Sequence, residues 1–256
     1  MPYRSHSIGL PLQHQSFRDL ISLVVLALLV TWSHSAEAAQ WEFLKQKEGI
    51  VVSAKESKLG NLPVFRGVGQ IKASIPEILA VMQDAPGATK WMHKCLENRP
   101  LEIQNVYDRI VYNRTDSPWP VWDRDVVVQT RGRIDIARKR IVIEMKSIED
   151  ARQPAVDGVV RIPRLAGHYV LRYITETLTE VEYQIDADPG GSLPSWLAEL
   201  ASRDLPYHTI RNLRNRVIQS INNAEYGAQI ALYESMNPLK SGNQQAKAED
   251  LSLIHI

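Results

Sequence analysis

The side chains best suited to catalysis are scattered along this 256-residue chain rather than grouped in a recognisable motif. The sequence contains no G-x-S-x-G nucleophile motif, no H-E-x-x-H metal motif and no phosphate-binding loop. His93 and Cys95 lie two positions apart but lack further ligands nearby, which favours a structural histidine beside a buried thiol over a metal site. His168 and His208 could each act as a base, yet no sequence feature pairs either with a nucleophile. We therefore expect no metal and no cofactor.

A second group of polar side chains falls on predicted strands. Arg109, Asn113, Tyr169, Tyr173 and Tyr183 could supply hydrogen-bonding or acid–base groups to a small substrate. Tyrosines on strands are more often packing residues. An enzymatic role for this group therefore stays open as an alternative.

The charge balance and cysteine content exclude several classes of protein. The chain has 30 Lys and Arg against 29 Asp and Glu, so it has no basic surplus to neutralise phosphates, and we expect no nucleic-acid partner. Its single cysteine, Cys95, excludes an internal disulfide and a thiolate-rich zinc site. Hydrophobic residues make up 44% of the chain, which is ample for the core of one domain.

The first 38 residues have the pattern of an export signal. A polar start with Arg4 and Arg18 precedes Leu20–Trp32, a 13-residue apolar run that is shorter than the roughly 18–20 residues needed to span a bilayer. The triplet Ala36-Glu37-Ala38 has the small-x-small pattern of a signal-peptidase site. We predict a signal peptide over 1–38, cleavage between Ala38 and Ala39, and a periplasmic or secreted product. An uncleaved anchor or a buried helix is the alternative.

The remaining chain divides into a folded body and a tail. No linker or internal repeat interrupts residues 39–234, which we predict to form one domain. Residues 235–256 are polar and are predicted to be a disordered C-terminal tail.

Alternation of apolar and polar residues predicts most of the domain to be β-sheet. The pattern is clearest in Asp125–Asp135, Arg140–Ser147 and Glu180–Asp188. The segment 65–69 (FRGVG) has two glycines but lacks the third of a dinucleotide-binding motif, and indicates a bend in a sheet. Short gaps between strands favour antiparallel pairing. Weaker strands are predicted at 50–56, 64–71, 106–113, 156–162 and 167–175.

Two helices accompany the predicted sheet. Ser74, followed by Pro76 and Glu77, is a helix start that leads through Met82. A longer helix is predicted from a cap at Asp204, with Pro206 in its first turn, to about residue 234. Its apolar face comprises Ile210, Leu213, Val217, Ile221, Ala224 and Ala228. A curved antiparallel sheet with one long helix across its concave side defines an α+β fold.

Three blocks of sequence resemble the START family, the steroidogenic-acute-regulatory-related lipid-transfer domains. Residues 110–126 have the family's core strand, Pro-aromatic-Pro loop and Arg-Asp strand start, including Pro118-Trp119-Pro120 and Asp123-Arg124-Asp125. Residues 188–197 resemble the loop into the family's final helix, and residues 205–214 resemble the beginning of that helix. Residues 41–50 resemble the opening helix and first strand. The similarity covers about residues 41–222.

The resemblance implies a helix-grip fold in which the sheet and last helix enclose a tunnel for one lipid. Some sterol-binding members place an Arg–acid pair in the tunnel, where this chain has Asn113 and Thr130. The ligand therefore stays open among phospholipid, sterol and fatty acid. Inward alternation and the helix's apolar face predict the tunnel lining: Val111, Asn113, Val128, Thr130, Ile143, Met145, Tyr183, Leu213, Val217 and Ile221.

The loop 114–123 is predicted to be the gate of this tunnel. Its two prolines disfavour a regular hairpin. Trp119 and Trp122 are suited to the headgroup zone of a bilayer and to transient membrane contact, although an inward-facing Trp122 is an equal alternative. Arg124 and Asp125 are expected to hold the base of the loop by local hydrogen bonds. These features favour non-enzymatic lipid binding and transfer. A cyclase- or hydrolase-like helix-grip enzyme acting on a small apolar substrate is the alternative.

Overall fold

The structure is a computed structural model that describes residues 41–57, 62–191 and 195–239. In this part of the chain the strands form one ten-stranded sheet in the order β1-β2-β3-β10-β9-β7-β6-β5-β4, with β8 paired to β6. Neighbours along that order are antiparallel, and only the β6–β8 pair among the described strands is parallel. The strands are β1 (Glu42–Lys47), β2 (Ile50–Lys55), β3 (Val64–Ile71), β4 (Cys95–Ile103), β5 (Arg109–Thr115), β6 (Asp123–Asp135), β7 (Arg140–Ser147), β8 (Val159–Arg161), β9 (Arg164–Thr175) and β10 (Leu178–Asp188).

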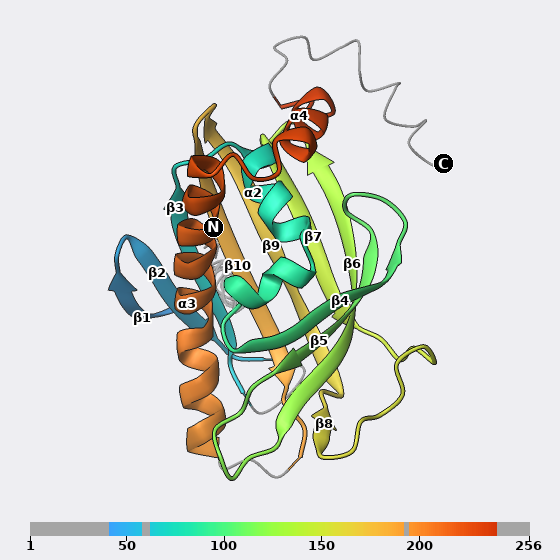
Figure 1. The fold of residues 1–256 in the computed structure, drawn as a ribbon. Helices are drawn as coiled ribbons and strands as arrows, with labels where there is room; N and C mark the ends of the chain where they lie inside the picture. The colour runs from blue at the N-terminus through green and yellow to red at the C-terminus, as the bar shows by residue number, and fades with distance from the viewer. Residues whose placement is uncertain (1–40, 58–61, 192–194, 240–256) are drawn as a thin grey trace, which may run out of the picture. The chain divides into compact units, whose positions relative to one another are not determined.

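The helices pack on the inner face of this sheet (Figure 1). They are α2 (Ile75–Gln83), the short 3-10 helix η1 (Pro86–Lys90), α3 (Ser195–Asn222) and α4 (Gly227–Ser235). Helix α3 lies along β2, β3 and β10, while α2 contacts α3, α4 and β9. This is the predicted α+β helix-grip fold, with a long C-terminal helix held by a curved antiparallel sheet.

Two glycines allow α3 to approach β3 closely. A Cβ atom at Gly67 would lie 2.9 Å from Cβ of Pro206, and one at Gly69 would lie 3.2 Å from Cγ2 of Ile210. Both distances are shorter than ordinary carbon contacts, so a side chain at either position would displace the helix. Gly67 and Gly69, which the sequence analysis assigned to a bend, are therefore the positions at which α3 packs closely on β3.

The predicted boundaries of the long helix are wrong at both ends. Helix α3 begins at Ser195 rather than after Asp204, and Pro206 consequently lies inside it. The predicted continuation to residue 234 is interrupted after Asn222, because Ala224 and Tyr226 take positive φ angles of 50° and 61°. Contacts distant in sequence hold this turn, since the Tyr226 hydroxyl donates to Asp84 at 2.5 Å. The periodicity of the residues around Tyr226 cannot predict a contact with a residue as distant in sequence as Asp84.

The sequence analysis missed two strands, β1 and β4, whose pairing with their neighbours is irregular. Neither β1 nor β4 was predicted, and the family resemblance placed a helix where β1 lies. The β1–β2 register shifts between Phe43 and Lys45, and the β4–β5 register shifts twice, once at Pro100. A bulge breaks the period-two alternation on which strand prediction depends. Helix α2, by contrast, has the predicted start, with a capping box between Ser74 and Glu77.

The described chain ends just beyond α4. That helix ends at Ser235, next to the predicted domain boundary, and Met236 and Leu239 pack against the core. The predicted signal peptide and its cleavage site lie outside the described residues, as do residues 240–256 of the tail predicted over 235–256. Among the described helices, none is long and apolar enough to cross a membrane.

Candidate functional site

A cavity of about 530 Å³ lies between the inner face of the sheet and the helices. This volume is within the range of roughly 300–1,000 Å³ typical of small-ligand sites. Its described wall comes from strands β4, β5, β6, β7, β9 and β10, from the segment that runs from the end of α2 through η1 to β4, from the β5–β6 loop, and from the first half of α3. Apolar side chains dominate the middle of the wall, including Val111, Val126, Val128, Ile143 and Met145.

Strand pairing brings the seven predicted strand positions onto this wall. Val111 pairs with Val128, and Thr130 pairs with Met145, so alternate residues of adjacent strands face the same space. The cavity is lined by all seven: Val111, Asn113, Val128, Thr130, Ile143, Met145 and Tyr183. Their contact with a ligand stays a prediction.

The three predicted helix positions lie elsewhere. Leu213 and Val217 are completely buried in the hydrophobic core, and Ile221 packs against that core rather than on the described cavity wall. Helix α2 packs against α3, and buried side chains of both helices belong to the same hydrophobic core. The contribution of α3 to the wall comes from earlier turns, at Asp204, Leu205, His208 and Thr209.

The β5–β6 loop forms one end of the cavity. Ser117, Pro118 and Val121 line it, whereas the side chains of Trp119 and Trp122 face solvent and are 92% and 64% exposed. Of the two alternatives for Trp122, the outward-facing one is present. The loop therefore combines an inner surface on the cavity with an outer surface bearing two indoles.

Charged side chains fix the base of this loop. The Asp123 carboxylate accepts hydrogen bonds from Arg114, at 2.6 Å from Nη2, and from the Ser117 backbone N–H at 3.2 Å. The hydrogen bond between Arg114 and Asp123 raises the pKa of the Arg114 guanidinium. Arg124 donates to the carbonyl of Trp122, which is the expected local bond, and also to the carbonyl of Gly190, which is distant in sequence.

Asp125 is held by a more distant partner than the local hydrogen bonds we expected. Its buried carboxylate forms a bidentate ion pair with Arg161 of β8, at 2.7 and 3.0 Å. The hydrogen bond to Asp125 raises the pKa of Arg161. This pair fastens the short parallel strand β8 to the start of β6, next to the loop.

The polar residues of the enzymatic alternative are mostly on the cavity wall, but they form no nucleophile–base pair. Tyr169 and Tyr183 stack with ring centroids 4.6 Å apart, and burial raises the pKa of both phenols well above the ordinary value. Arg109 and Asn113 also line the wall, whereas Tyr173 packs against the core. The two tyrosines are neutral hydrogen-bonding groups at physiological pH.

Cys95 has an environment that makes its thiol unreactive. Burial raises its pKa and outweighs the hydrogen bond that its sulfur accepts from Asn113 Nδ2 at 3.2 Å, which acts in the opposite direction. A thiol rather than a thiolate is therefore present near neutral pH, and a thiol is a poor nucleophile. Among the described residues, no three His, Cys, Asp or Glu side chains are grouped closely enough to hold a metal ion.

Sequence analysis missed a histidine pair beside the cavity. His93, just before β4, stacks on His208 of α3 with ring centroids 4.5 Å apart and an interplanar angle of 11°. Both line the cavity, and burial is the main cause that lowers the pKa of each. The two residues are far apart in sequence, so only the packing of α3 beside the η1–β4 segment reveals the pair.

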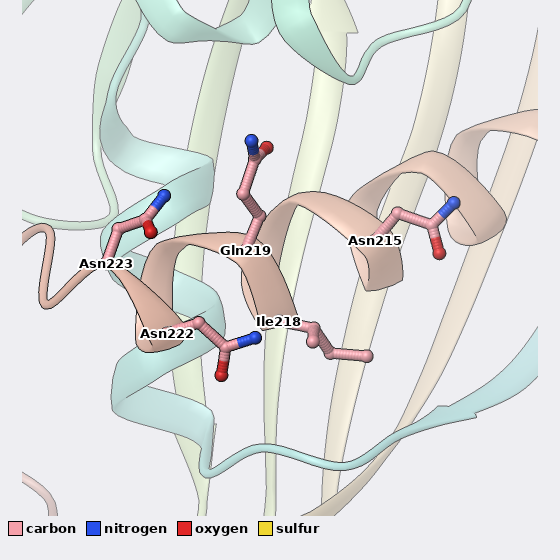
Figure 2. A pocket seen from close by; sticks show the side chains of 5 residues that line it. All are labelled: Asn215, Ile218, Gln219, Asn222 and Asn223. Atoms are coloured by element: carbon pink, nitrogen blue, oxygen red, sulfur yellow. The ribbon is translucent and has the colours of Figure 1, made fainter.

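A separate depression lies on the outer side of α3. Figure 2 shows its five side chains, which come from the end of α3 and the residue that follows it: Asn215, Ile218, Gln219, Asn222 and Asn223. They point in different directions around the helix, and none carries a charge. The depression has no enclosed apolar wall, so the inner cavity is the candidate site.

Comparisons with known proteins assign the chain to a family. The model of the START domain matches residues 31–216, and the chain belongs to the START domain family. An uncharacterized protein of Pseudomonas aeruginosa is 34% identical over 199 residues, which cover 77% of this chain and 97% of that protein. The phosphatidylcholine transfer protein of Rattus norvegicus is 27% identical over 172 residues, which cover 65% of this chain and 78% of that protein.

Solved structures agree with this family assignment. A STAR-related lipid transfer protein fragment from Xanthomonas axonopodis is 30% identical, with a TM-score of 0.63 over 69% of this chain and 98% of that one. Human StAR-related lipid transfer protein 5 has a TM-score of 0.64 at 18% identity, over 80% of this chain and 98% of that one, and it supports the fold alone.

Proposed function

We propose that this protein binds one lipid in the inner cavity and transfers it between membranes without covalent chemistry. The observation that carries this proposal is a largely apolar cavity whose described wall lacks a paired nucleophile and base. Each buried CH₂ group contributes about 0.8 kcal/mol, so an acyl chain or sterol would bind tightly by burial alone. The names of the rat and Xanthomonas relatives, a phosphatidylcholine transfer protein and a lipid transfer protein, support the same function.

The enzymatic alternative has less support. A helix-grip enzyme would require a side chain poised to exchange a proton or attack a substrate near neutral pH. The cavity tyrosines have raised pKa values, burial raises the pKa of the Cys95 thiol, and His93 and His208 stack on each other rather than on a nucleophile. We therefore favour a carrier whose lipid is a phospholipid, a sterol or a fatty acid.

The β5–β6 loop is the proposed gate and membrane contact. Two exposed indoles on a loop that also lines the cavity can insert at the headgroup level while the loop moves aside. The export signal predicted over residues 1–38 supports a periplasmic or secreted site of action, where such a carrier would meet membrane surfaces.

Native mass spectrometry of the purified protein, followed by organic extraction, tests the carrier function. A lipid bound one-to-one is the expected result. An empty cavity together with turnover of a small ester or aromatic substrate would favour the enzyme instead.

Vesicle transfer kinetics test the gate. Trp119→Ala should slow lipid transfer several-fold while equilibrium affinity for the same lipid is kept, because Trp119 faces solvent rather than the cavity. Phe43→Ala, which removes an exposed aromatic side chain from β1, is the matched control and should leave transfer unchanged. An unchanged transfer rate in Trp119→Ala would reject the gate.

A further inference from the structure

Three cationic side chains gather around one buried tyrosine outside the cavity. The ammonium groups of Lys45 and Lys47 on β1 lie 5.1 and 5.4 Å from the ring centroid of Tyr207 on α3. The guanidinium of Arg211, one turn further along α3, lies 5.6 Å from the same centroid. Lys45 and Lys47 alternate along β1 and therefore share one face of that strand. Lys45, Lys47 and Arg211 together form the basic patch.

Two cations of the basic patch have no carboxylate of their own. Neither Lys47 nor Arg211 takes part in an ion pair with another described residue, and Arg211 donates its hydrogen bonds to Asn212 Oδ1. The Glu48 carboxylate beside them accepts a hydrogen bond from the Tyr207 hydroxyl at 2.6 Å. That bond is the main cause that lowers the pKa of Glu48, and the charges of Arg211 and Lys47 lower it further. Two cations thus share one carboxylate that is already bonded.

This excess of positive charge is local. The whole chain is nearly neutral, with 30 Lys and Arg against 29 Asp and Glu. The end of the cavity formed by the β5–β6 loop, which we call the mouth, has cations that are balanced. Lys94 lies 3.7 Å from Asp116, and Arg114 is bound to Asp123. An added anion therefore gains more at the basic patch than at the β5–β6 loop.

The basic patch adjoins the cavity wall at the mouth. Lys45 is bound to Asp204, and Asp204 lines the cavity. His208 also lines the cavity and packs edge-on against Tyr207, with ring centroids 5.1 Å apart. The other neighbour of His208 is His93, in the segment before β4. Strand β4 begins opposite the end of β5, where the β5–β6 loop starts. The patch and the exposed indoles of that loop therefore belong to the same end of the molecule.

We infer that the basic patch is a docking surface for an anionic bilayer, in which lipid phosphates lie against Lys47 and Arg211 while the mouth faces the membrane. This inference rests on the proposed carrier function, because a carrier must bring its mouth to a bilayer. The arginine fork matches phosphate oxygens, and the lysine ammonium adds a mobile point charge. The patch selects the charge of the membrane, whereas the indoles provide a contact that does not depend on it.

Cosedimentation of the full chain with two kinds of vesicle tests this inference. Vesicles that contain phosphatidylglycerol should bind the protein at least about tenfold more tightly than vesicles of phosphatidylcholine alone. Lys47→Gln and Arg211→Gln should each weaken binding to the phosphatidylglycerol vesicles about fivefold, and should leave binding to phosphatidylcholine unchanged. Lys47→Arg and Arg211→Lys retain the charge and should retain the binding.

Arg131→Gln is the matched control, because it removes an exposed positive charge from the opposite face of the sheet. Its neighbour Thr130 lines the cavity, so Arg131 points away from the cavity and from the basic patch. This variant should bind both kinds of vesicle like the unsubstituted protein. An equal loss of binding in Arg131→Gln and Lys47→Gln would reduce the effect to net charge and overturn the docking surface.

Salt and inorganic phosphate distinguish a charged surface from a discrete phosphate site. Raising the salt from about 0.1 M to about 1 M shortens the Debye length from about 10 Å to about 3 Å, and should abolish the preference for phosphatidylglycerol. Inorganic phosphate should release the protein from vesicles no better than sulfate at equal ionic strength. Selective release by phosphate would overturn docking to a bilayer in favour of a site for free phosphate.

The outcomes separate this inference from the proposed function. Equal binding to the two kinds of vesicle, or unchanged binding of both Gln variants, would overturn the docking surface, while native mass spectrometry still reports whether a lipid occupies the cavity. An empty cavity in a protein that binds anionic vesicles through the patch would reject the carrier instead. Self-association of Lys47→Gln with unchanged vesicle binding would assign Lys47 to protection of the edge strand β1. If Arg211→Gln does not fold, the exposed position Lys47 still decides.

Discussion

The two ends of the cavity are built in different ways. At the mouth, the wall is formed by the β5–β6 loop, the residues before β4 and the first half of α3, and two indoles are exposed. At the far end, the wall is formed by α2 and Arg109, and α4 packs behind them. The mouth is therefore formed by a loop, the segment before β4 and one end of a helix, and the far end by packed helices.

The contacts that hold α3 to its neighbours also differ between the two ends. At the far end, the Tyr226 hydroxyl donates to Asp84 and accepts from Arg216, which joins α2, α3 and the turn before α4. At the mouth, α3 meets the η1–β4 segment through the stacked rings of His93 and His208. The carrier function proposed above assigns ligand exchange to the mouth, beside the exposed tryptophans.

Two tryptophan substitutions should give opposite phenotypes and provide the largest effects. Val128→Trp adds an indole to the cavity wall, so lipid loading should be lost with the fold largely kept. Val217→Trp places the same volume in the fully buried core beside α2, and should destabilise the fold by at least about 1–3 kcal/mol. Lipid loading by native mass spectrometry and thermal unfolding distinguish the two.

Normal loading of Val128→Trp would mean that the cavity is not the lipid site. A Val217→Trp protein with ordinary stability but no bound lipid would place the tunnel along the second half of α3, as the periodicity of that helix predicted.

This contrast shows what the sequence could and could not predict. The strand part of the wall follows from alternation, because a period-two pattern fixes which residues share a face. The helix part does not, because the apolar face of α3 is shared between the sheet, α2 and the cavity. Nothing in the local pattern around Val217 distinguishes burial by a neighbouring helix from exposure to a cavity.

Features that depend on pairing across the fold were also inaccessible to sequence analysis. The stacking of His93 on His208 and the bond from Arg109 to the Gln83 carbonyl emerge only when distant segments are brought together. The outward direction of Trp122 depends on how Asp123 and Arg124 hold the loop. The family resemblance gave the fold, but not these contacts.

Substitution of Gly67 should produce the next largest effect, and it acts on the mouth end. Gly67→Ala brings a methyl group within 2.9 Å of Pro206 Cβ and 3.2 Å of its carbonyl oxygen. The first half of α3 must shift away from β3, at a cost of about 1–3 kcal/mol. Denaturant unfolding measures the loss.

Gly227→Ala is the matched control, because no atom lies within 4 Å of the added methyl group and the residue begins α4. It should be neutral or slightly stabilising. Equal stability of Gly67→Ala and Gly227→Ala would show that α3 does not pack closely on the glycines of β3.

Loss of the Tyr226 hydroxyl tests the far end. Tyr226→Phe removes the bonds to Asp84 and Arg216 and should cost about 1–2 kcal/mol, since both partners are left partly unsatisfied. Amide hydrogen exchange should accelerate in α4 and at the end of α2, and not in the β5–β6 loop. Tyr173→Phe, whose hydroxyl has no hydrogen bond to the described residues, is the control. Faster exchange at the mouth would contradict the independence of the two ends.

The smallest effect should be a pH dependence confined to the mouth. Burial lowers the pKa of His93 and of His208, and the charge of His208 lowers that of His93 further. Asp204 opposes these shifts. The cations that add to them are Lys94 and Arg211 around His93, and Arg211, Lys45 and Lys47 around His208. The folded protein therefore resists protonation of a pair that takes up protons freely once the chain unfolds.

The direction of the effect follows from this difference in proton uptake. The contribution of the pair to stability is complete above the unfolded pKa of about 6.5 and falls as the pH decreases through the lowered folded-state values. Unfolding free energies between about pH 8 and pH 5 measure the decrease, which His93→Gln and His208→Gln should each reduce. Hydrogen exchange at about pH 5.5 should accelerate in the first half of α3 but not around Tyr226, because protonated rings that stack at 4.5 Å repel each other. The same acid sensitivity in both histidine variants would assign the titration to other groups.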